Sequence, residues 1–361
     1  MRVLSCYNAG IMKVTKRQQL ILDELRLRGS LSTKDLLESL AKSGHKVSED
    51  SLGRDLNQLK ALGFQESSGQ GPARKHSLSD KGWLLSTMDK TAFDSYLNSP
   101  RPPIPYDRQV LARLFSVPLF DTAETSQLAK MQQAFTSFTK GVDKQTCARW
   151  YQKWLIEFAW KSSAIEGNTY SALETETLLI DHIEAAGKSH AEAQMIINHQ
   201  TAMRFAKDNP QIFIEPALGT IEHTHRLLVE GLGVTSGLRK HQVGISGSTY
   251  TPISSQERIK TELDWLIGQA ATMRDPWAKS LSHLIALSYL QAFADGNKRT
   301  ARVVANGILG AHNLPPLVLS AVDPTTYRRA CLAFYELGSL DQIKQVALTS
   351  WQQTVDQVNF S

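Results

Sequence analysis

The sequence is poor in cysteine and contains no long hydrophobic run. Its 3 cysteines, Cys6, Cys147 and Cys331, are far apart, which indicates neither a disulfide framework nor a metal site of the CxxC type. No apolar stretch approaches the roughly 20 residues of a membrane helix. The first residues lack an apolar segment followed by a small-residue cleavage site. Internal repeats and low-complexity tracts are lacking too. We therefore expect a cytoplasmic protein without a membrane partner.

Positive charge is concentrated at the N-terminal end. The hydrophobic fraction of 42% and the charged fraction of 21% are ordinary for a globular protein, and 361 residues suffice for two or three domains. Residues 1–79 carry the whole net charge of +5, with 13 Lys or Arg against 8 Asp or Glu. Any affinity for a polyanion such as DNA is therefore expected in that segment.

Residues 1–85 show three helical patterns followed by a basic, turn-rich stretch. Helices are expected in TKRQQLILDELRLRG, in STKDLLESLAKSG, which begins with the capping residues Ser32 and Thr33, and in SEDSLGRDLNQLKALGF, which begins at Ser48. The stretch QESSGQGPARKHSLSDKG predicts a hairpin. This order indicates a winged helix-turn-helix domain whose third helix would enter the DNA major groove. The residues expected to contact DNA are Ser51, Arg54, Asn57, Lys60, Arg74 and Lys75. A small helical domain with solvated charge, or a winged helix that binds protein, is the alternative.

A proline-rich segment separates this part from the rest of the chain. The four prolines of LNSPRPPIPYDRQV preclude a continuous helix, so residues 86–110 are expected to be a linker before a core at 111–361. Nearly all of the core is predicted to be helical. The exception is GLRKHQVGISGSTYTPISSQER, whose β-prone runs around Gly247 predict a small hairpin. The expected fold class is mainly α, with a β-hairpin flap.

The stretch LQAFADGNKRTAR, residues 290–302, combines a helix break with several charges. An apolar helix precedes ADGN and another helix follows it, so the break lies at a helix N-terminus, where Gly296 permits a left-handed backbone and free N–H groups can hold an anion. Arg299 and Arg302 share a helical face, and Asp295 offers an oxygen ligand for Mg²⁺. These residues predict a polyphosphate site. A plain αα-hairpin with solvated or paired arginines is the alternative.

QAFADGNKRTAR resembles the signature of the Fic (Fido) family, HxFx(D/E)GN(G/K)RxxR, at every defined position except the first. SSAIEGNTYSALET resembles the inhibitory motif of that family, (S/T)xxxE(G/N), and VGISGSTYTP resembles its target-docking flap. RPPIPYDRQVLARLF is similar to the segment that precedes the family core, so the resemblance extends over residues 95–355. The matched residues of the two motifs are Ser162, Glu166 and Gly167 for inhibition, and Gly247, Tyr250 and Pro252 for the flap.

The resemblance implies an all-helical Fido core and a protein adenylyltransferase with ATP and Mg²⁺ as cofactors. AMP would pass to a hydroxyl of a target protein or of the chain itself, and the flap would hold the target backbone as an added strand. The nest around Gly296 and the side chain of Arg299 would bind the α- and β-phosphates, Arg302 the γ-phosphate, and Asp295 the Mg²⁺. The nucleotide-binding residues that it implies are Gly296, Asn297, Lys298, Arg299, Arg302 and Asn306, with Tyr327 near the adenine.

Glu166 lies at the end of an apolar helix expected near residues 150–167. Gly167 is a natural residue after such a helix, and Ser171 with Glu174 forms a capping box for the next one. A negative charge at a helix C-terminus is unfavourable unless a nearby cation pairs with it. The resemblance implies that this cation is Arg302 and that the pair blocks the γ-phosphate. The alternative is an ordinary surface acid before a glycine.

Gln291 stands where the family signature has its catalytic histidine. An amide cannot accept a proton near neutral pH, and losing a general base costs about 10² to 10⁴ in rate. Three functions stay open: a transferase that is weak or uses another base, a nucleotide-sensing pseudoenzyme that acts as a DNA-binding regulator, and a transferase of a different phosphate-linked group. The sequence cannot place His241 or His283 as a substitute base. It leaves a homodimer open.

Overall fold

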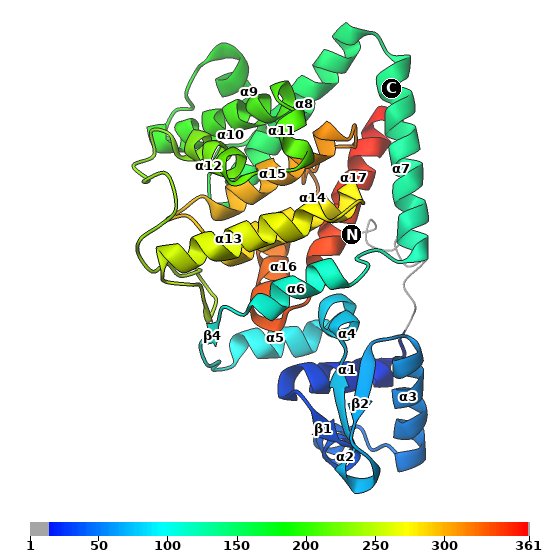
Figure 1. Ribbon diagram of the computed structural model, residues 1–361. Helices are drawn as coiled ribbons and strands as arrows, with labels where there is room; N and C mark the ends of the chain where they lie inside the picture. Colours follow the sequence, from blue (N-terminus) through cyan, green and yellow to red (C-terminus); the bar gives the residue numbers. More distant parts are fainter. Residues whose placement is uncertain (1–13, 360–361) are drawn as a thin grey trace.

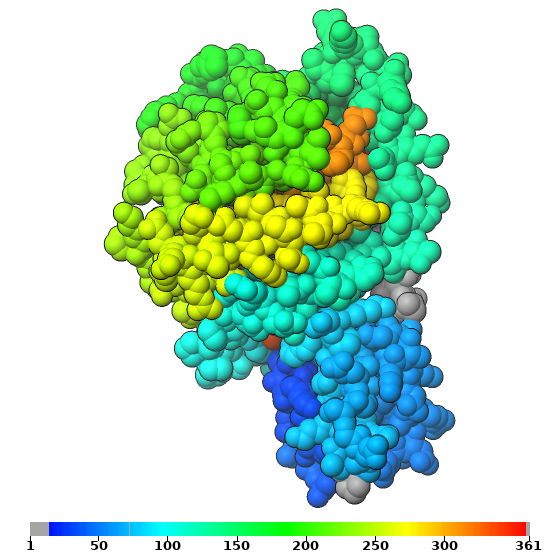
Figure 2. Space-filling view, in the orientation of Figure 1, coloured from blue at the N-terminus to red at the C-terminus, as the bar shows by residue number. Residues whose placement is uncertain are grey.

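The computed structural model describes residues 14–359, so the expectations that rest on residues 1–13, Cys6 included, lie outside the described residues. The fold is mainly α-helical with a few short strands, which confirms the predicted fold class. A small N-terminal lobe projects from a larger helical body (Figures 1 and 2). Within residues 14–359, the structure contains no helix with the length and apolar character needed to cross a membrane.

Residues 16–85 fold into a small domain of helices around a three-stranded sheet. Strand β3 lies in the middle and pairs antiparallel with both β1 and β2, and a leucine-rich core lies beneath the helices. Ser32 and Ser48 cap α2 and α3 through their side chains, as predicted. The elements are α1 (Lys16–Arg28), β1 (Leu31–Ser32), α2 (Thr33–Lys42), α3 (Glu49–Ala61), β2 (Gln65–Ser68), β3 (Lys75–Leu78) and α4 (Asp80–Leu85). The winged-helix assignment stays a prediction.

The segment expected to be a linker is ordered and packs against the helical body. It contains α5 (Lys90–Asn98) and β4 (Ile104–Pro105) before α6 (Arg108–Ser116) begins. Phe93 of α5 is buried in a cluster with Ala333 and Leu337 of α16. The prolines end the helix at Asn98 without freeing the chain, because the backbone after them pairs with the flap.

The helical body is built around two buried antiparallel helices. Its elements are α7 (Thr122–Gly141), α8 (Lys144–Ile165), α9 (Ala172–Asp181), α10 (His190–Asp208), α11 (Gln211–Ile214), α12 (Leu218–Val229), β5 (Tyr250–Thr251), α13 (Gln256–Ala271), α14 (Pro276–Leu290), α15 (Asn297–Ala311), α16 (Pro324–Leu337) and α17 (Asp341–Asn359). Helix α14 is buried from Trp277 to its end and packs along α15. Helices α10, α12, α13, α16 and α17 contact this pair, so the turn between α14 and α15 is held on several sides (Figure 1).

The predicted β-hairpin of the flap is wrong. Residues 230–255 form an irregular loop with one short strand, β5, and that strand pairs in parallel with β4. The N–H groups of Ile104 and Tyr106 donate to the carbonyl oxygens of Thr249 and Thr251. The run HQVGI is not a strand, although a turn closed by Ser248 N–H and the Ile245 oxygen lies between it and β5. The partner of β5 is instead a distant segment, β4.

The N-terminal domain is anchored to the helical body by Arg26, which is only 4% exposed. Its guanidinium donates to the backbone oxygens of Gly82, Trp83 and Ser86 and, across the domain boundary, to that of Leu337 at 2.6 Å. Burial lowers the pKa of Arg26 to about 10, so the group stays charged at neutral pH. The positive charge of Arg26 therefore lies at the C-terminal end of α16, where the free carbonyl oxygens of a helix favour a cation.

Candidate functional site

The turn between α14 and α15 presents an uncapped helix N-terminus. Gly296 has the predicted left-handed backbone, with φ of +79°, and a Cβ atom at this position would lie 3.1 Å from Cγ1 of Val229. No side chain caps α15. The Asn297 side chain turns back instead, accepting from the N–H of Phe293 at 2.8 Å and donating to the Phe293 oxygen. The first N–H groups of the helix therefore remain available to an anion.

A pocket of about 130 Å³ lies in front of this helix start. One wall is the motif itself, a second is the flap, and Glu166 closes a third side. The lining residues are Glu166, Val243, Gly244, Ile245, Ser246, Gln291, Ala294, Asp295, Gly296, Asn297 and Lys298. The structure thus brings together the predicted Asp295, Gly296, Asn297 and Lys298 with Glu166 and Gln291, from three separate parts of the chain.

Gln291 is held rigidly and offers no base to the pocket. It has a left-handed backbone, with φ of +51°, and ends α14. Its side-chain amide donates to the Ser288 oxygen at 2.6 Å and accepts from Asn297 Nδ2 at 3.1 Å. Arg239, buried under the flap, donates to the Gln291 carbonyl oxygen at 2.6 Å and also to the backbone oxygens of His241 and Ile253. The flap base and the start of the motif are therefore fixed to each other.

Asp295 and Arg299 pair with each other in this structure. Nη2 of Arg299 donates to Oδ2 of Asp295 at 2.9 Å, and Nη1 donates to the Leu228 oxygen at 3.3 Å. The arginine side chain is 3% exposed and the aspartate 68%. Burial lowers the pKa of Arg299, which the charge of Asp295 partly offsets. Asp295 is thus a solvent-facing carboxylate at the mouth of the pocket, whereas Arg299 lies beneath it.

Arg302 is fully buried and gripped by the end of α8. Its Nε donates to Ser162 Oγ at 2.8 Å, and Nη2 donates to the Ser162 backbone oxygen at 3.0 Å and to Glu166 Oε1 at 2.8 Å. The guanidinium also lies 5.4 Å from the ring centre of Tyr327. Nη1 has no hydrogen-bond partner among residues 14–359. A buried cation with one unsatisfied donor is a group that an additional acceptor would stabilise.

Glu166 is a strong acid in this setting. The predicted helix end is confirmed: α8 stops at Ile165, Glu166 follows it, and Gly167 has φ of +96°. Burial acts to raise the pKa of Glu166, but the charges of Arg302 and of Lys298, 3.1 Å away, outweigh it and lower the value to about 2. The carboxylate is therefore ionised throughout the neutral range, and it lines the pocket while paired with Arg302.

His199 is a supporting residue that the sequence interpretation missed. Its Nδ1–H donates to the Met195 oxygen at 2.8 Å, so Nε2 accepts from Ser162 Oγ at 2.8 Å. Burial lowers the pKa of His199 to about 3, which keeps the ring neutral. Ser162 can then donate to His199 and still accept from Arg302. A single histidine inside α10 carries no sequence signal for this contact, which becomes visible only when α8 and α10 pack together.

Several predicted residues lie outside the pocket. Tyr250 is 3% exposed and its side chain donates to the Tyr289 oxygen at 2.8 Å, so that side chain points away from the pocket; strand addition by a target at the flap stays a prediction. The flap residues that face the pocket are those at 243–246, whereas Gly247 and Pro252 are not among its lining residues. Asn306 bonds to both backbone groups of Leu317 and lines a different cavity. Neither His241 nor the buried His283 lines the pocket.

The residues predicted to contact DNA lie on α3 and at the start of β3 in the N-terminal domain. Those with exposed side chains are Arg54, Asn57, Lys60, Arg74 and Lys75. Ser51 is half-buried and accepts from Arg54 at 3.2 Å. Glu49 and Asp50 share the first turn of α3, so this surface is not uniformly positive. Contact with DNA stays a prediction.

Comparisons with known proteins agree on one family. A sequence model of the Fic/DOC family matches residues 217–309. The protein adenylyltransferase fic-1 of Caenorhabditis elegans is 27% identical over 241 residues, which cover 64% of this chain and 46% of that protein. The protein adenylyltransferase Fic of Nematostella vectensis is 24% identical over 274 residues, covering 73% of this chain and 63% of that protein. The aligned part thus spans between about half and two thirds of these relatives.

The solved structure of residues 134–508 of Fic-1 from C. elegans has a TM-score of 0.57 to this chain at 21% identity, covering 74% of this chain and 80% of that one. At this identity the likeness shows a shared fold. The matched region of the family model contains the α14–α15 turn and the flap, which form two of the three sides of the pocket, whereas Glu166 lies outside it. This chain is thus similar to Fic/DOC-family proteins in the region that holds the motif, and it shares their fold.

Proposed function

We propose that this chain binds ATP with Mg²⁺ at the start of α15 and is nominally a protein adenylyltransferase, with AMP transfer that is weak or absent. Arg302 carries the proposal. It is a wholly buried guanidinium with an unsatisfied donor, its acidic partner among the described residues is Glu166, and an uncapped helix N-terminus lies beside it. Phosphate groups fit such a combination of backbone N–H groups and forked cations.

The residues fit a nucleotide phosphate chain with a metal ion. Lys298 and the N–H groups after Gly296 would hold the α- and β-phosphates, and Arg302 would hold the γ-phosphate once Glu166 withdraws. Asp295 is the exposed carboxylate of the pocket, and Mg²⁺ in nucleotide sites is held by one or two carboxylates plus phosphate oxygens. The ion would neutralise phosphate charge. Arg299 would then exchange Asp295 for a phosphate oxygen as its partner.

Transfer requires a proton acceptor that the pocket supplies poorly. A target hydroxyl would attack the α-phosphorus, pyrophosphate would leave, and the hydroxyl proton would need a base. The amide of Gln291 cannot take it, and the described pocket lining contains no imidazole. Glu166 and Asp295 are the carboxylates there, and both have assigned partners. Slow or absent transfer with intact nucleotide binding follows from this chemistry.

Calorimetric titration with MgATP tests the proposal. Replacement of Glu166 by glycine removes the competitor for Arg302, so we expect affinity to rise at least about tenfold, equivalent to about 1.4 kcal/mol. Glu184→Gln, which alters an exposed acid paired with His190, is the matched control and should leave affinity unchanged. Equal affinities for the protein and Glu166→Gly, or no binding by either, would contradict the proposal.

A second candidate function is that of a nucleotide-sensing regulator, and it is favoured because α16 connects the surroundings of Arg302 with the N-terminal domain. This helix carries Tyr327 under Arg302 near its start, and its end accepts the hydrogen bond of Arg26 from the N-terminal domain. A change at Arg302 therefore has a continuous helix through which to reach that domain. Retention of the full chain on duplex DNA, measured with and without MgATP, should fall steeply with salt and differ between nucleotide states. No retention at low ionic strength would remove this candidate.

A further inference from the structure

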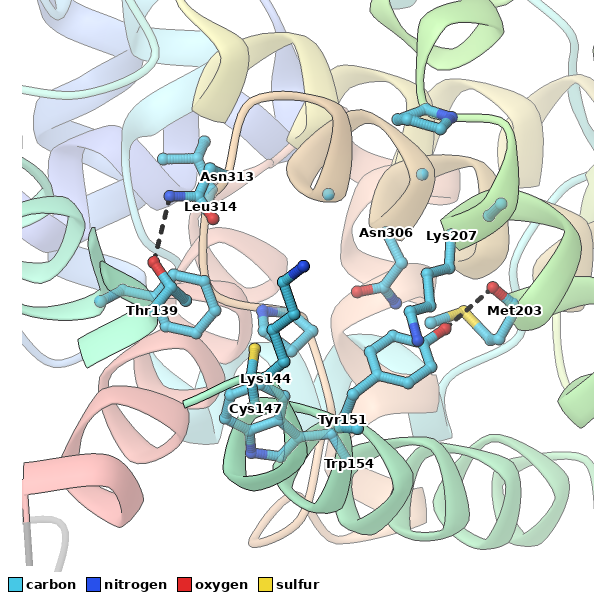
Figure 3. Close-up of a pocket in the computed structure, with 17 residues that line it drawn as sticks. Thr139, Lys144, Cys147, Tyr151, Trp154, Met203, Lys207, Asn306, Asn313 and Leu314 are labelled. Atoms are coloured by element: carbon cyan, nitrogen blue, oxygen red, sulfur yellow. Dashed lines mark hydrogen bonds between the residues drawn. The ribbon is translucent and has the colours of Figure 1, made fainter. Parts of the chain in front are cut away.

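A second cavity, separate from the nucleotide pocket, lies between α7, α8, α10 and the end of α15 (Figure 3). Its volume is about 420 Å³, within the range of about 300 to 1,000 Å³ that is typical of small-molecule sites. None of its lining residues lines the nucleotide pocket. In Figure 2 the orange residues after α15 are visible between the green and the teal helices, so this region reaches the surface.

The walls of this cavity are mostly apolar. Phe135, Trp154, Met203 and Leu314 supply hydrophobic surface from four different segments. The polar groups among them are already bonded: the Tyr151 hydroxyl donates to the Met203 oxygen at 3.0 Å, and the side chains of Asn306 and Asn313 bond to Leu317 and Thr139. A guest molecule would therefore need an apolar body, since the walls have few free polar partners for it.

Two lysines give the cavity a positive mouth. Lys144 extends into the open space in Figure 3, and Lys207 lies with its Nζ 4.0 Å from the ring centre of Tyr151. No acidic residue lines the cavity within the part of the chain that the structure describes. Asp143 and Asp208 adjoin the lysines in sequence, but neither is a lining residue, and Asp143 bonds to Thr146 instead.

We propose that this cavity binds a small apolar molecule that carries one carboxylate, with the carboxylate at Lys144 and Lys207 and the apolar body against Trp154 and Phe135. Two ammonium groups beside an acid-free apolar space match that combination of charge and shape. The surface of α15 also leaves room for such a molecule. An added Cβ at Gly310 of α15 would meet no atom within 4 Å, so the helix surface there is open to a guest.

Decanoate is the probe, used on the full chain below its micelle concentration, with decanol as the uncharged analogue. Cys147 lines the cavity, so its alkylation, followed by mass spectrometry of its peptide, reports occupancy directly. We expect saturable 1:1 binding that slows alkylation of Cys147, with decanol much weaker. Lys144→Gln combined with Lys207→Gln should lower decanoate affinity at least about tenfold, because a charged hydrogen-bond partner is lost.

Two further variants complete the experiment. Gly310→Leu places a side chain into the cavity and should abolish protection of Cys147. Lys153→Gln combined with Lys161→Gln, which removes two cations that lie over tryptophan rings elsewhere on α8, should leave affinity unchanged. Absence of saturable binding, equal binding of decanol and decanoate, or full affinity in the Lys144/Lys207 variant would each overturn the proposal.

Discussion

Nη2 of Arg302 lies 2.8 Å from Oε1 of Glu166, although 136 residues separate them in the chain. The arginine side chain has no exposed surface and the glutamate is 17% exposed. The pair joins the end of α8 to α15, the helix whose N-terminus forms the candidate phosphate cradle. Breaking it should therefore change both the stability of the fold and the affinity for a nucleotide.

Glu166→Gln should lower the free energy of unfolding by about 3 kcal/mol, because removal of one partner leaves a buried charge without compensation. Urea titration in the absence of nucleotide measures this. Saturating MgATP should raise the free energy of unfolding more in the variant than in the unmodified protein, since a phosphate would take the place of the lost carboxylate beside Arg302. A loss below about 1 kcal/mol, the range of an exposed pair, would show that the contact is weak in solution.

Stability should fall as pH is lowered from 6.5 towards 4. Burial lowers the pKa values of His199, His225 and His283 to about 3, 4 and 4, below the ordinary value for histidine near 6.5. In this window the unfolded chain binds protons that the folded chain excludes, so acid favours unfolding. The stabilising effect of the neutral rings is complete above about pH 6.5 and declines below it.

His283→Leu isolates one of these groups. Between pH 7 and pH 5 the free energy of unfolding should fall by about 2 kcal/mol more in the unmodified protein than in this variant. The reason is that the variant, which lacks the imidazole of His283, takes up one proton fewer on unfolding. His182→Asn, at an exposed position with φ of +60°, is the control and should keep the pH dependence. Parallel curves for all three proteins would show that His283 is protonated in the folded state.

Gly296→Ala should destabilise the protein by at least about 1 kcal/mol and abolish MgATP binding, because the left-handed backbone disfavours a Cβ and that atom would press on Val229. Gly268→Ala is a matched control in the last turn of α13, where an added Cβ meets no atom within 4 Å. That change should be neutral or stabilise by about 0.5 to 1 kcal/mol. Unchanged MgATP affinity in Gly296→Ala would show that the N-terminus of α15 does not bind the phosphates.

Arg26→Met should loosen the N-terminal domain from the helical body. The variant loses hydrogen bonds to Gly82, Trp83, Ser86 and, across the boundary, Leu337. We expect two separate thermal transitions and faster proteolysis between residues 86 and 90. Arg28→Met, two residues further along α1 with a side chain that is 48% exposed, should retain a single transition. One transition for both variants would indicate that the apolar contacts of α5 suffice to couple the domains.

Local chemistry made the helix ends predictable. Ser32, Ser48 and the Ser171–Glu174 capping box start helices as expected, and Gly167 follows α8 in a left-handed conformation, because caps depend on neighbours within four residues. The left-handed Gly296 was predictable for the same reason. Each of these features is decided by a few adjacent residues.

Contacts between distant segments were not predictable. The flap lacks its expected hairpin, and the strand that pairs with β5 is β4, about 145 residues earlier in the chain. Tyr250 has the residue type of a docking side chain but is buried against Tyr289. His199 carries no local signal, and its role beside Ser162 depends on how α8 packs against α10.

Transfer of label from ATP labelled at the α-phosphate tests the central claim most directly: that the pocket binds nucleotide but lacks a base at Gln291. Glu166→Gly and Glu166→Gly combined with Gln291→His would be incubated with MgATP and examined for self-modification. The account predicts label on the double variant and at least about 100-fold less on the single one, the cost of a missing general base. Comparable labelling of both would contradict it and would show that another group accepts the proton.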